Sequence, residues 1–510
     1  MKLLTNVQAK RLDRIALKKH SRTGHSLMKN AGLCVSNLAI SLLRKVQNPE
    51  ILVICGKGNN GGDGFAAASI LKENNYNVSI HTLIPEEEIS GEGLKYFLEC
   101  KKKGVLISFY LETQNRHFPD LIIDGLFGTG LSRAIRPKIF KYIQWVNQSN
   151  SKVLAIDIPS GLNGDTGEVS SIAVKADKTI TFGYPKLGMI LKKGPKYCGQ
   201  IIEKDIGFPE ITDTELGGIN WINFSEEKCK EILKKPELDN HKYTSGKVLI
   251  IAGSKGMTGA AILSTSAALR SGAGLTITTT PSSLNYIYET NLIEGITFSL
   301  PDENRGYLDI SHYDSIMEKV EWADSVLVGP GLGRNKSTQL LIKKLVESIA
   351  KPLILDADGL FPYSDSLNEL SGRQTPLIIT PHFGEFSRLI NIAVEDIISN
   401  FPTIMENTLK VFNHTLLIKQ VPICTLKKNK AVVNVTGNPG LATAGTGDIL
   451  SGILASLLSS GLNSFDAATV GAFVQGKSSD ELISHKGIRG QIASDLLETI
   501  PSVISKYELS

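Results

Sequence analysis

A single carboxylate lies inside a glycine-rich stretch near the end of the chain. Residues 434–460 read NVTGNPGLATAGTGDILSGILASLLSS, a polar loop that runs into a long apolar helix. Gly445 and Gly447 let a ligand approach the backbone, and the free N–H groups at the helix start favour an anion. Asp448 can be a helix cap, or a general base that takes a proton from a hydroxyl while the amides hold a phosphoryl group. The stretch by itself leaves both interpretations open.

A second glycine-rich loop follows the first predicted strand. Residues 50–55 (EILVIC) form an apolar run typical of a buried parallel strand, and residues 56–64 (GKGNNGGDG) are predicted to form a loop ahead of a small-residue helix. The loop satisfies GxGxxG, the phosphate-binding pattern of dinucleotide folds. That pattern also needs an acid after the next strand, predicted at residues 78–83. Residues 86–88 (EEE) are candidates, but they follow Pro85 and are predicted to lie in a loop.

Acids and amides occur at the predicted carboxyl ends of three strands. Residues 118–124 (FPDLIID) and 153–157 (VLAID) each end in an aspartate ahead of a glycine loop. Because the carboxyl ends of parallel strands share one edge of a sheet, these side chains are expected in one crevice, where they suit a cation or a ligand with several hydrogen-bonding groups. The alternative is a set of turn residues that bond their own backbone. The side chains concerned are Asn59, Asn60, Asp63, Asp124, Asp157 and Ser160.

The C-terminal half alternates strands and helices, which predicts a parallel α/β sheet with right-handed crossovers. GPGLG at 329–333 lacks the Lys-Ser/Thr of a Walker loop, so a P-loop NTPase is excluded. His382 follows Pro381 at a strand end, beside Glu385, and is either a ligand contact or an exposed loop residue. Strands are predicted at residues 247–253, 275–279, 325–328, 352–356, 376–380 and 415–419, and a hairpin at 424–435.

Length and composition limit the class of protein. A chain of 510 residues is expected to form two or more domains. We place the boundary between residues 218 and 219, in a region (208–240) where glycine loops and strand signals stop. The hydrophobic content of 42% and charged content of 21% are typical of folded globular proteins. The net charge of +4 is too diffuse to indicate a nucleic-acid partner.

Cysteine usage and the N-terminus predict a cytoplasmic protein. The six cysteines are scattered and include no CxxC pair, which argues against a zinc site and a disulfide scaffold and fits a reducing compartment. The first twenty residues carry charges throughout, unlike a signal peptide. No apolar run is expected to be long enough to span a bilayer, so no membrane partner is predicted. A symmetric homo-oligomer is only the base-rate expectation.

Four separated motifs in the N-terminal half resemble those of NAD(P)H-hydrate epimerase, in the same order and over about residues 1–215. They are NNGGDGF (59–65), DGLFGTGL (124–131), AIDIPSGLNGDTG (155–167) and TFGYPKLG (181–188). The resemblance implies a Rossmann-like three-layer αβα domain that binds a hydrated nicotinamide nucleotide and a potassium ion. Epimerisation at a carbon that bears a hydroxyl and the ring nitrogen needs reversible bond opening and a proton shuttle, for which we prefer Asp157.

That resemblance also implies which residues hold the ligands. The implied substrate contacts are Asn59, Asn60, Gly61, Gly62, Asp63, Gly128, Thr129, Gly130, Leu131, Ser132, Arg133, Ala134 and Asp157. The implied potassium ligands are Asn60, Asp124 and Ser160.

The C-terminal half resembles the ribokinase-like superfamily and, within it, NAD(P)H-hydrate dehydratase, over about residues 225–505. The motifs are HKYTSGKVLIIAGS (241–254), GPGLG (329–333), LDADGL (355–360), TPHFGE (380–385) and GTGDILSG (445–452). The resemblance implies a ribokinase-like αβα domain that uses ADP with Mg²⁺ to phosphorylate the hydroxyl of (S)-NAD(P)HX. The transfer turns ADP into AMP, and loss of phosphate from the hydrate then restores NADH or NADPH. Asp448 is the implied base, which favours the catalytic interpretation of the stretch at 434–460.

Two small departures from the family pattern accompany the implied contacts. Lys419-Gln-Val421 stands where relatives commonly have KGA, and Phe383 stands where they tend to have proline. The implied contacts with the hydrated nucleotide are Ala261, Gly331, His382 and Asp448. The implied contacts with ADP are Lys419, Gln420, Val421, Pro422, Ile423 and Gly447.

The sequence therefore predicts a bifunctional repair enzyme with domains at 1–218 and 219–510, acting on NADHX, NADPHX and ADP. One alternative is a ribokinase-like kinase of a small alcohol, such as a vitamin precursor, fused to a nucleotide-binding module. The block at 241–254 argues against it. Another is a binding module whose N-terminal half has lost catalysis. The intact Asp124 and Asp157 argue against that alternative.

Overall fold

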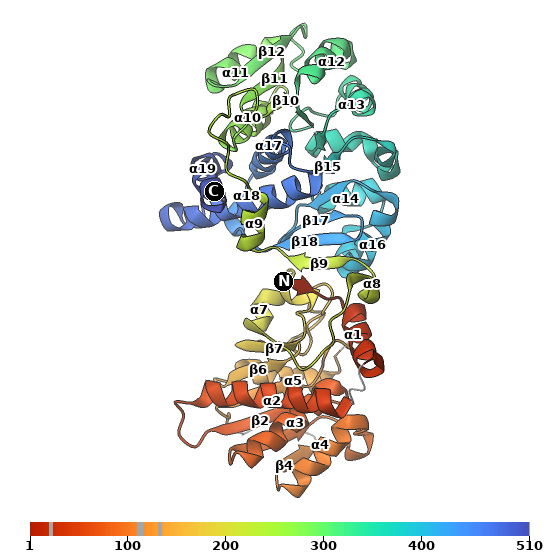
Figure 1. Cartoon of the computed structure of the whole chain (residues 1–510), viewed down its shortest axis with the longest axis vertical. Coiled ribbons are helices and arrows are strands. Elements are labelled where there is room, and N and C mark those ends of the chain that lie inside the picture. Colours follow the sequence, from red (N-terminus) through yellow and green to blue (C-terminus); the bar gives the residue numbers. More distant parts are fainter. Residues whose placement is uncertain (20–23, 110–116, 131–134, 509–510) are drawn as a thin grey trace. The chain divides into compact units, whose positions relative to one another are not determined.

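The computed structural model describes residues 1–19, 24–109, 117–130 and 135–508 (Figure 1). These residues form two compact units. The N-terminal unit comprises Lys2–Trp221 and Ser399–Pro402, and the C-terminal unit comprises Met1, Ile222–Ile398 and Thr403–Ser510. Each is an α/β unit built on a parallel sheet, which confirms the predicted fold class.

The N-terminal sheet has seven parallel strands in the order β4-β3-β2-β5-β6-β7-β8. The order reverses between β2 and β5, and a ligand crevice is expected outside the carboxyl ends of the strands at such a point. The strands of the unit are β1 (Lys2–Leu3), β2 (Glu50–Cys55), β3 (Asn77–Thr82), β4 (Leu106–Phe109), β5 (Leu121–Gly125), β6 (Lys152–Ile156), β7 (Lys178–Phe182) and β8 (Gln200–Lys204).

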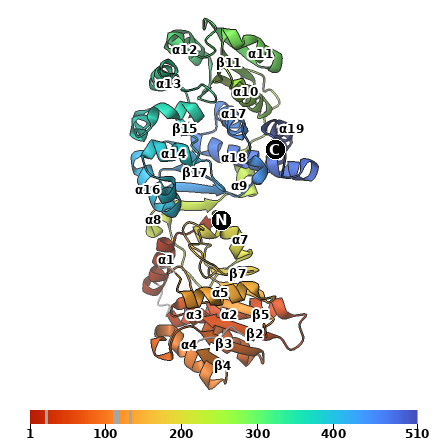
Figure 2. The same cartoon turned by 180° about the vertical axis from the view of Figure 1, so that it is seen from behind.

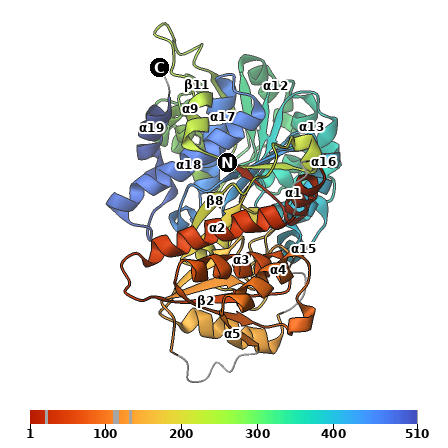
Figure 3. The same ribbon diagram turned by 60° about the horizontal axis from the view of Figure 1, so that its bottom comes forward.

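Helices cover both faces of this sheet because its strands are apolar on both sides. In β2, Ile51 and Val53 pack toward α2, α3 and α4, whereas Leu52 and Ile54 pack toward α5 (Figure 3). The helices are α1 (Asn6–Lys19), α2 (Gly24–Leu43), α3 (Asn59–Glu73), α4 (Gly91–Lys102), α5 (Pro137–Gln148), α6 (Leu187–Ile190), α7 (Gly194–Cys198) and α8 (Asp213–Leu216), with a 3-10 turn, η1 (Glu86–Glu88).

The glycine-rich segment after β2 is helical, not a loop as predicted. Helix α3 begins at Asn59, and its N-cap residue, Gly58, has no side chain that could cap the helix. Its glycines permit close packing: a Cβ on Gly61 would lie 1.9 Å from the Gly56 carbonyl oxygen, and one on Gly62 would lie 2.4 Å from Met28 Cε. Tertiary packing thus outweighs the low helix propensity of glycine. The polar side chains of this segment sit on the first turns of a helix.

One segment has the length and composition of a membrane span, so the expectation that none would was wrong. Among the described residues, Ser26–Leu43 in α2 meets that criterion, and 44% of it is buried within the fold. Its packing is that of a core helix. A Cβ on Gly32 would lie 2.6 Å from Ala66 Cβ of α3, which shows how closely the two helices approach.

The C-terminal sheet runs in the order β18-β17-β16-β15-β14-β13-β10-β11-β12. Strands β10 to β16 are parallel, and β17 and β18 form the predicted antiparallel hairpin. The predicted strands are confirmed, with small differences at their ends. The strands of this sheet, of which only β12 was not predicted, are β10 (Lys247–Ile251), β11 (Leu275–Pro281), β12 (Ile296–Leu300), β13 (Ser325–Val328), β14 (Leu353–Leu355), β15 (Leu377–Ile379), β16 (Thr415–Ile418), β17 (Ile423–Lys427) and β18 (Lys430–Asn434).

Helices α10, α17, α18 and α19 lie on one side of this sheet, and α12, α13, α14 and α16 on the other (Figures 1 and 2). Strand residues such as Val248 and Ile250 share a core with the first group. The helices are α9 (Glu226–Ile232), α10 (Thr258–Arg270), α11 (Asn285–Asn291), α12 (Tyr313–Trp322), α13 (Lys336–Ser348), α14 (Phe383–Ile390), α15 (Val394–Ser399), α16 (Phe401–Val411), α17 (Thr446–Ser459), α18 (Ser464–Lys486) and α19 (Leu496–Tyr507).

The region between the two predicted domains contains a strand that the sequence did not predict. It is β9 (Asn220–Asn223), within the segment 208–240 where strand signals were expected to stop. Its sequence, NWIN, does not alternate between apolar and polar residues, and Trp221 is almost completely buried. A four-residue strand of this kind is too short for a periodicity argument to detect.

Candidate active sites

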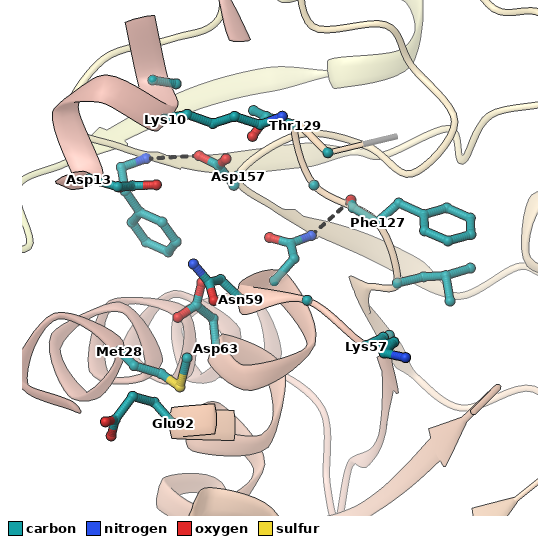
Figure 4. Close-up of a pocket in the computed structure, with 18 of the residues that line it drawn as sticks. Lys10, Asp13, Met28, Lys57, Asn59, Asp63, Glu92, Phe127, Thr129 and Asp157 are labelled. Carbon is teal, nitrogen blue, oxygen red and sulfur yellow. Dashed lines mark hydrogen bonds between the residues drawn. The ribbon is translucent and has the colours of Figure 1, made fainter. Parts of the chain in front are cut away.

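A cavity of about 990 Å³ opens at the carboxyl edge of the N-terminal sheet (Figure 4). Its walls come from α1, α2, the first turns of α3 and the segments that follow β2, β3, β5, β6 and β7. This is the edge at which the strand order reverses. The predicted substrate contacts that line the cavity are Asn59, Asn60, Asp63, Gly128, Thr129, Gly130 and Asp157.

Other predicted residues of this half lie elsewhere. Gly61 and Gly62 are buried in α3 and serve its packing against neighbouring backbone and Met28. Asp124 and Ser160 are completely buried and do not line the cavity. Leu131, Ser132, Arg133 and Ala134 fall outside the described residues.

An ion pair between Asp157 and Lys186 lies on the cavity wall. Asp157 follows β6 in a left-handed backbone conformation (φ +62°), which is uncommon for a residue other than glycine but is adopted more readily by aspartate than by most residues. Lys186 is 3% exposed, and its ammonium also donates to Thr181 Oγ1 at 3.0 Å. The sequence placed Lys186 within the TFGYPKLG motif but gave it no role.

Two more carboxylates share the cavity with this pair. Asp13 is accessible from the cavity, yet desolvation by the surrounding protein and the nearby Asp157 charge raise its pKa to about 6. Burial, followed by the charges of Asp157 and Asp13, raises the pKa of Asp63 well above its usual value. Figure 4 shows all three carboxylates on the same side of the cavity. Such a set can both accept and supply protons near neutral pH.

A cluster of oxygen atoms lies beneath this cavity. Asp124 Oδ1 accepts from Ser160 Oγ at 2.6 Å, and Asp124 Oδ2 accepts from the Ser160 amide at 2.8 Å. Asn60 Nδ2 donates to the Phe127 carbonyl at 2.9 Å. Burial raises the pKa of Asp124, although its hydrogen bonds partly offset that effect. Among the described residues, no ion pair joins Asp124 to a basic side chain.

In the C-terminal unit, Asp448 lies in the first turn of α17. The N-cap residue is Gly445, whose φ of +91° suits glycine, and it has no side chain that could cap the helix. Asp448 is thus an acid of the first turn and not the N-cap residue itself, and its role as a base stays a prediction. Desolvation, then the charge of Asp356, raises the pKa of Asp448 to about 7, while Lys419 lowers it. A carboxylate with this pKa beside the free amides of a helix start is suited to act as a base near neutral pH.

A buried ion pair supports this helix start. Lys419 Nζ lies 2.6 Å from Asp356 Oδ1, and Ser451 Oγ of α17 donates to Asp356 Oδ2 at 2.7 Å. Burial alone would raise the pKa of Asp356, but Lys419 and these hydrogen bonds lower it below its usual value. A Cβ on Gly447 would lie 3.5 Å from Lys419 Nζ, so the ammonium borders the glycine-rich turn. The sequence did not identify Asp356 as a site residue.

His382 caps helix α14. Its Nδ1 accepts from the amides of Gly384 (3.0 Å) and Glu385 (3.2 Å), and Glu385 in turn accepts from the His382 amide at 2.9 Å. A ring nitrogen that accepts two bonds carries no proton, so Nε2 holds the hydrogen and can donate it. The imidazole side chain is 54% exposed. It is thus an ordered capping residue and not a free loop side chain.

The remaining predicted contacts of this half surround the carboxyl ends of β10, β13 and β16. Gly331 has a φ of +62°, and its carbonyl accepts from Ser254 Oγ at 2.8 Å. Ala261 is fully buried beneath the turn at Gly253. Of the residues predicted for ADP, Lys419, Gln420, Val421 and Pro422 join β16 to β17, and Ile423 is the first residue of β17.

Comparisons with known proteins agree for both halves. Residues 24–188 match the family described as YjeF-related protein N-terminus, and residues 248–502 match the family NAD(P)H-hydrate dehydratase. The bifunctional NAD(P)H-hydrate repair enzyme Nnr of Moorella thermoacetica is 34% identical over 100% of this chain and 97% of its own. The chain belongs to the bifunctional NAD(P)H-hydrate repair enzymes. Its N-terminal half is the epimerase and its C-terminal half the dehydratase.

Other repair enzymes of this family show similar relationships. The Nnr protein of Dictyoglomus turgidum is 34% identical over 99% of both chains, and that of Escherichia coli is 32% identical over 89% of this chain and 85% of its own. A solved ADP/ATP-dependent NAD(P)H-hydrate dehydratase from Bacillus subtilis, co-crystallised with ATP and Mg²⁺, covers 56% of this chain and 99% of its own, with 23% identity and a TM-score of 0.48.

The Asp356–Lys419 pair of this repair enzyme is expected to stabilise the dehydratase half. Lys419→Met leaves a buried carboxylate without its partner and should lower the free energy of unfolding by about 3–5 kcal/mol. The pair lowers the pKa of Asp356, so its full contribution to the free energy of unfolding is present above the ordinary pKa of aspartate. That contribution is lost as the pH falls through the lowered pKa of Asp356. Hydrogen exchange of the β14 amides measures the change.

The matched control is Lys343→Met, which breaks the pair with Glu369, whose side chains are 38% and 50% exposed. That change should cost less than about 1 kcal/mol. Equal effects of the two substitutions would show that the Asp356–Lys419 pair contributes no special stability.

Proposed function

We propose that Asp448 is the catalytic base of the dehydratase half. The observation that carries this proposal is a carboxylate with a pKa of about 7 at the amide-rich start of α17. Asp448 takes the proton of the substrate hydroxyl while that oxygen bonds to the transferring phosphorus. Amides of the turn and the Lys419 ammonium balance the phosphoryl charge. Burial, and after it the charge of the neighbouring Asp356, raises the pKa of Asp448 and keeps it basic enough for this task.

The later steps follow from the chemistry of the hydrate. The donor's bridging P–O bond breaks as the new one forms, so ADP leaves AMP. The phosphorylated oxygen departs with its bonding electrons as phosphate, and the ring nitrogen lone pair forms a C=N bond. Loss of a proton from the adjacent carbon restores the dihydronicotinamide. We propose ADP as the donor; supplying (S)-NADHX with ADP or with ATP, and measuring AMP against ADP as product, distinguishes the two nucleotides.

Phosphoryl transfer of this kind ordinarily uses Mg²⁺, which would neutralise phosphate charge when bound. Among the described residues, no group of three or more His, Cys, Asp or Glu side chains has the arrangement of a metal site. The residues present fit an ion that is carried mainly by nucleotide phosphates and water, with one carboxylate such as Asp358. Asp358 accepts from the Gly333 amide at 2.9 Å, at the end of the GPGLG loop.

The assignment of Asp448 predicts a pH dependence. Asp448 acts only when ionised, and its pKa is raised to about 7. We therefore expect the dehydratase kcat/KM to fall about tenfold per pH unit below that value and to level off above it. Initial rates with (S)-NADHX and ADP over a pH series measure the profile. A profile that stays flat well below pH 7 would contradict the assignment.

For the epimerase half, we propose that Asp157 and Asp13 move protons during reversible ring opening. Asp157 takes the proton of the hydroxyl as the bond from carbon to ring nitrogen breaks, which leaves an aldehyde. Asp13, with a pKa of about 6, supplies a proton to the nitrogen. Rotation and the reverse steps close the ring on the other face. Lys186 holds Asp157 in position, and its single positive charge offsets part of the negative charge around it.

We further propose that Asn60, Asp124 and Ser160 hold a potassium ion. Support comes from a buried carboxylate that no described basic side chain neutralises, together with the amide oxygen of Asn60 and the carbonyl of Phe127. Hard oxygen donors of this kind suit a monovalent cation such as potassium. Such an ion would supply a fixed positive charge beside the substrate. We also propose a cytoplasmic location, which the six free cysteines favour.

A further inference from the structure

The epimerase cavity has a second end, away from its carboxylates. Figure 4 shows Lys57 and Phe127 on one side of the cavity and Asp13, Asp63 and Asp157 on the other. This second end is largely apolar, and most of its apolar side chains pack against a common core. An apolar slot beside a reaction centre is suited to a flat aromatic group. The apolar side chains that line it are Leu83, Ile84, Phe127, Ile135 and Ile139.

A charged pair borders the same end. Lys57 Nζ lies 3.1 Å from Glu88 Oε2, and the two side chains are 62% and 47% exposed. Both line the cavity. Lys57 belongs to the GxGxxG segment after β2, and Glu88 belongs to η1, shortly after β3. The reaction chemistry proposed above uses neither residue.

The strand order indicates what this pair faces. The sheet has the β4-β3-β2-β5-β6-β7 order of dinucleotide-binding folds, with β3 next to β2. In such folds an acid after the second strand bonds the adenosine ribose 2′-hydroxyl, and a basic side chain nearby accommodates a 2′-phosphate. Glu88 and Lys57 occupy these two positions, and the apolar slot lies beside them for the adenine.

Resting on the proposed epimerase function, we infer that this end binds the adenosine half of the substrate, and that Glu88 and Lys57 set the preference between NADHX and NADPHX. The Glu88 carboxylate accepts from the 2′-hydroxyl of NADHX and repels the 2′-phosphate of NADPHX. Lys57 attracts that phosphate but is held by Glu88. The two side chains therefore act on the preference in opposite directions.

The experiment measures epimerisation of pure (R)-NADHX and (R)-NADPHX by chromatographic separation of the epimers. Leaving out ADP and ATP keeps the dehydratase half of the full-length protein silent. Glu88→Gln removes the repulsion and frees Lys57, so the ratio of kcat/KM for NADPHX to that for NADHX should rise by at least about threefold, as expected for one exposed charge interaction. Lys57→Met should lower the same ratio.

Glu86→Gln is the matched control. Glu86 belongs to the same turn and forms an ion pair with Lys101 at 2.8 Å, with side chains 45% and 48% exposed, but neither residue lines the cavity. In Glu86→Gln, the ratio of kcat/KM for NADPHX to that for NADHX should equal that of the wild-type protein. An unchanged ratio in Glu88→Gln, or a shift of the same size in Glu86→Gln, would overturn the inference. Absence of epimerisation in the wild-type protein would instead contradict the proposed function.

Discussion

Asp448→Asn is expected to reduce nucleotide-dependent restoration of NADH from (S)-NADHX by about 10²–10⁴-fold, the usual contribution of a positioned general base. The amide keeps the size and polarity of the side chain but cannot accept the hydroxyl proton. The substitution removes a carboxylate whose burial raises its pKa, so the fold should not lose stability. Epimerisation in the N-terminal half should remain unchanged. Initial rates and nucleotide binding by calorimetry measure the two effects separately.

Asp466→Asn is a suitable control for Asp448→Asn, because Asp466 is also an acid in the first turn of a helix, α18. Its loss should leave restoration of NADH unchanged. If Asp448→Asn kept near-normal turnover, Asp448 would contribute only charge at the helix start.

Asp157→Asn is expected to lower epimerisation by a similar factor of about 10²–10⁴, because it removes the proposed proton acceptor. Lys186→Met should also lower it, since Lys186 holds the Asp157 carboxylate by a buried ion pair. Dehydration of pure (S)-NADHX should be unaffected in both variants, which shows that the dehydratase half is still folded, and the circular dichroism of each variant should match that of the wild type. Conversion of pure (R)-NADHX to the S form, measured without nucleotide, reports the loss.

The control for these two variants is Glu168→Gln. Glu168 pairs with Lys193 at 2.9 Å in the same unit but does not line the cavity. Normal interconversion in Asp157→Asn would remove Asp157 from the reaction and leave Asp13 and Asp63 as the candidates.

Local sequence patterns predicted most of the fold. Short apolar runs such as residues 50–55 and 325–328 coincide with β2 and β13, because a strand buried on both faces has few polar positions. The start of α3 was predicted as a loop because glycine has a low helix propensity. In the structure, Gly61 and Gly62 pack closely against neighbouring backbone and Met28, and this packing favours the helix.

The site residues that the sequence missed come from elements distant in the chain. Asp13 lies on an amphipathic helix, α1, where a carboxylate is ordinarily a solvated charge. It joins Asp157 only because α1 forms one wall of the cavity. Asp356 likewise gains its importance from Lys419 and Ser451, both far along the chain. Contacts of this kind depend on tertiary structure, and no spacing rule in one sequence reveals them.

The most direct test of a bifunctional repair enzyme is to supply an equal mixture of (R)- and (S)-NADHX with excess ADP and Mg²⁺ and to follow the absorbance of the restored dihydronicotinamide. We predict that all of the hydrate returns to NADH, first quickly as the S epimer is used and then at the rate of epimerisation. Restoration that stops when the S epimer is exhausted would contradict the epimerase activity. No restoration with either ADP or ATP would contradict the dehydratase activity.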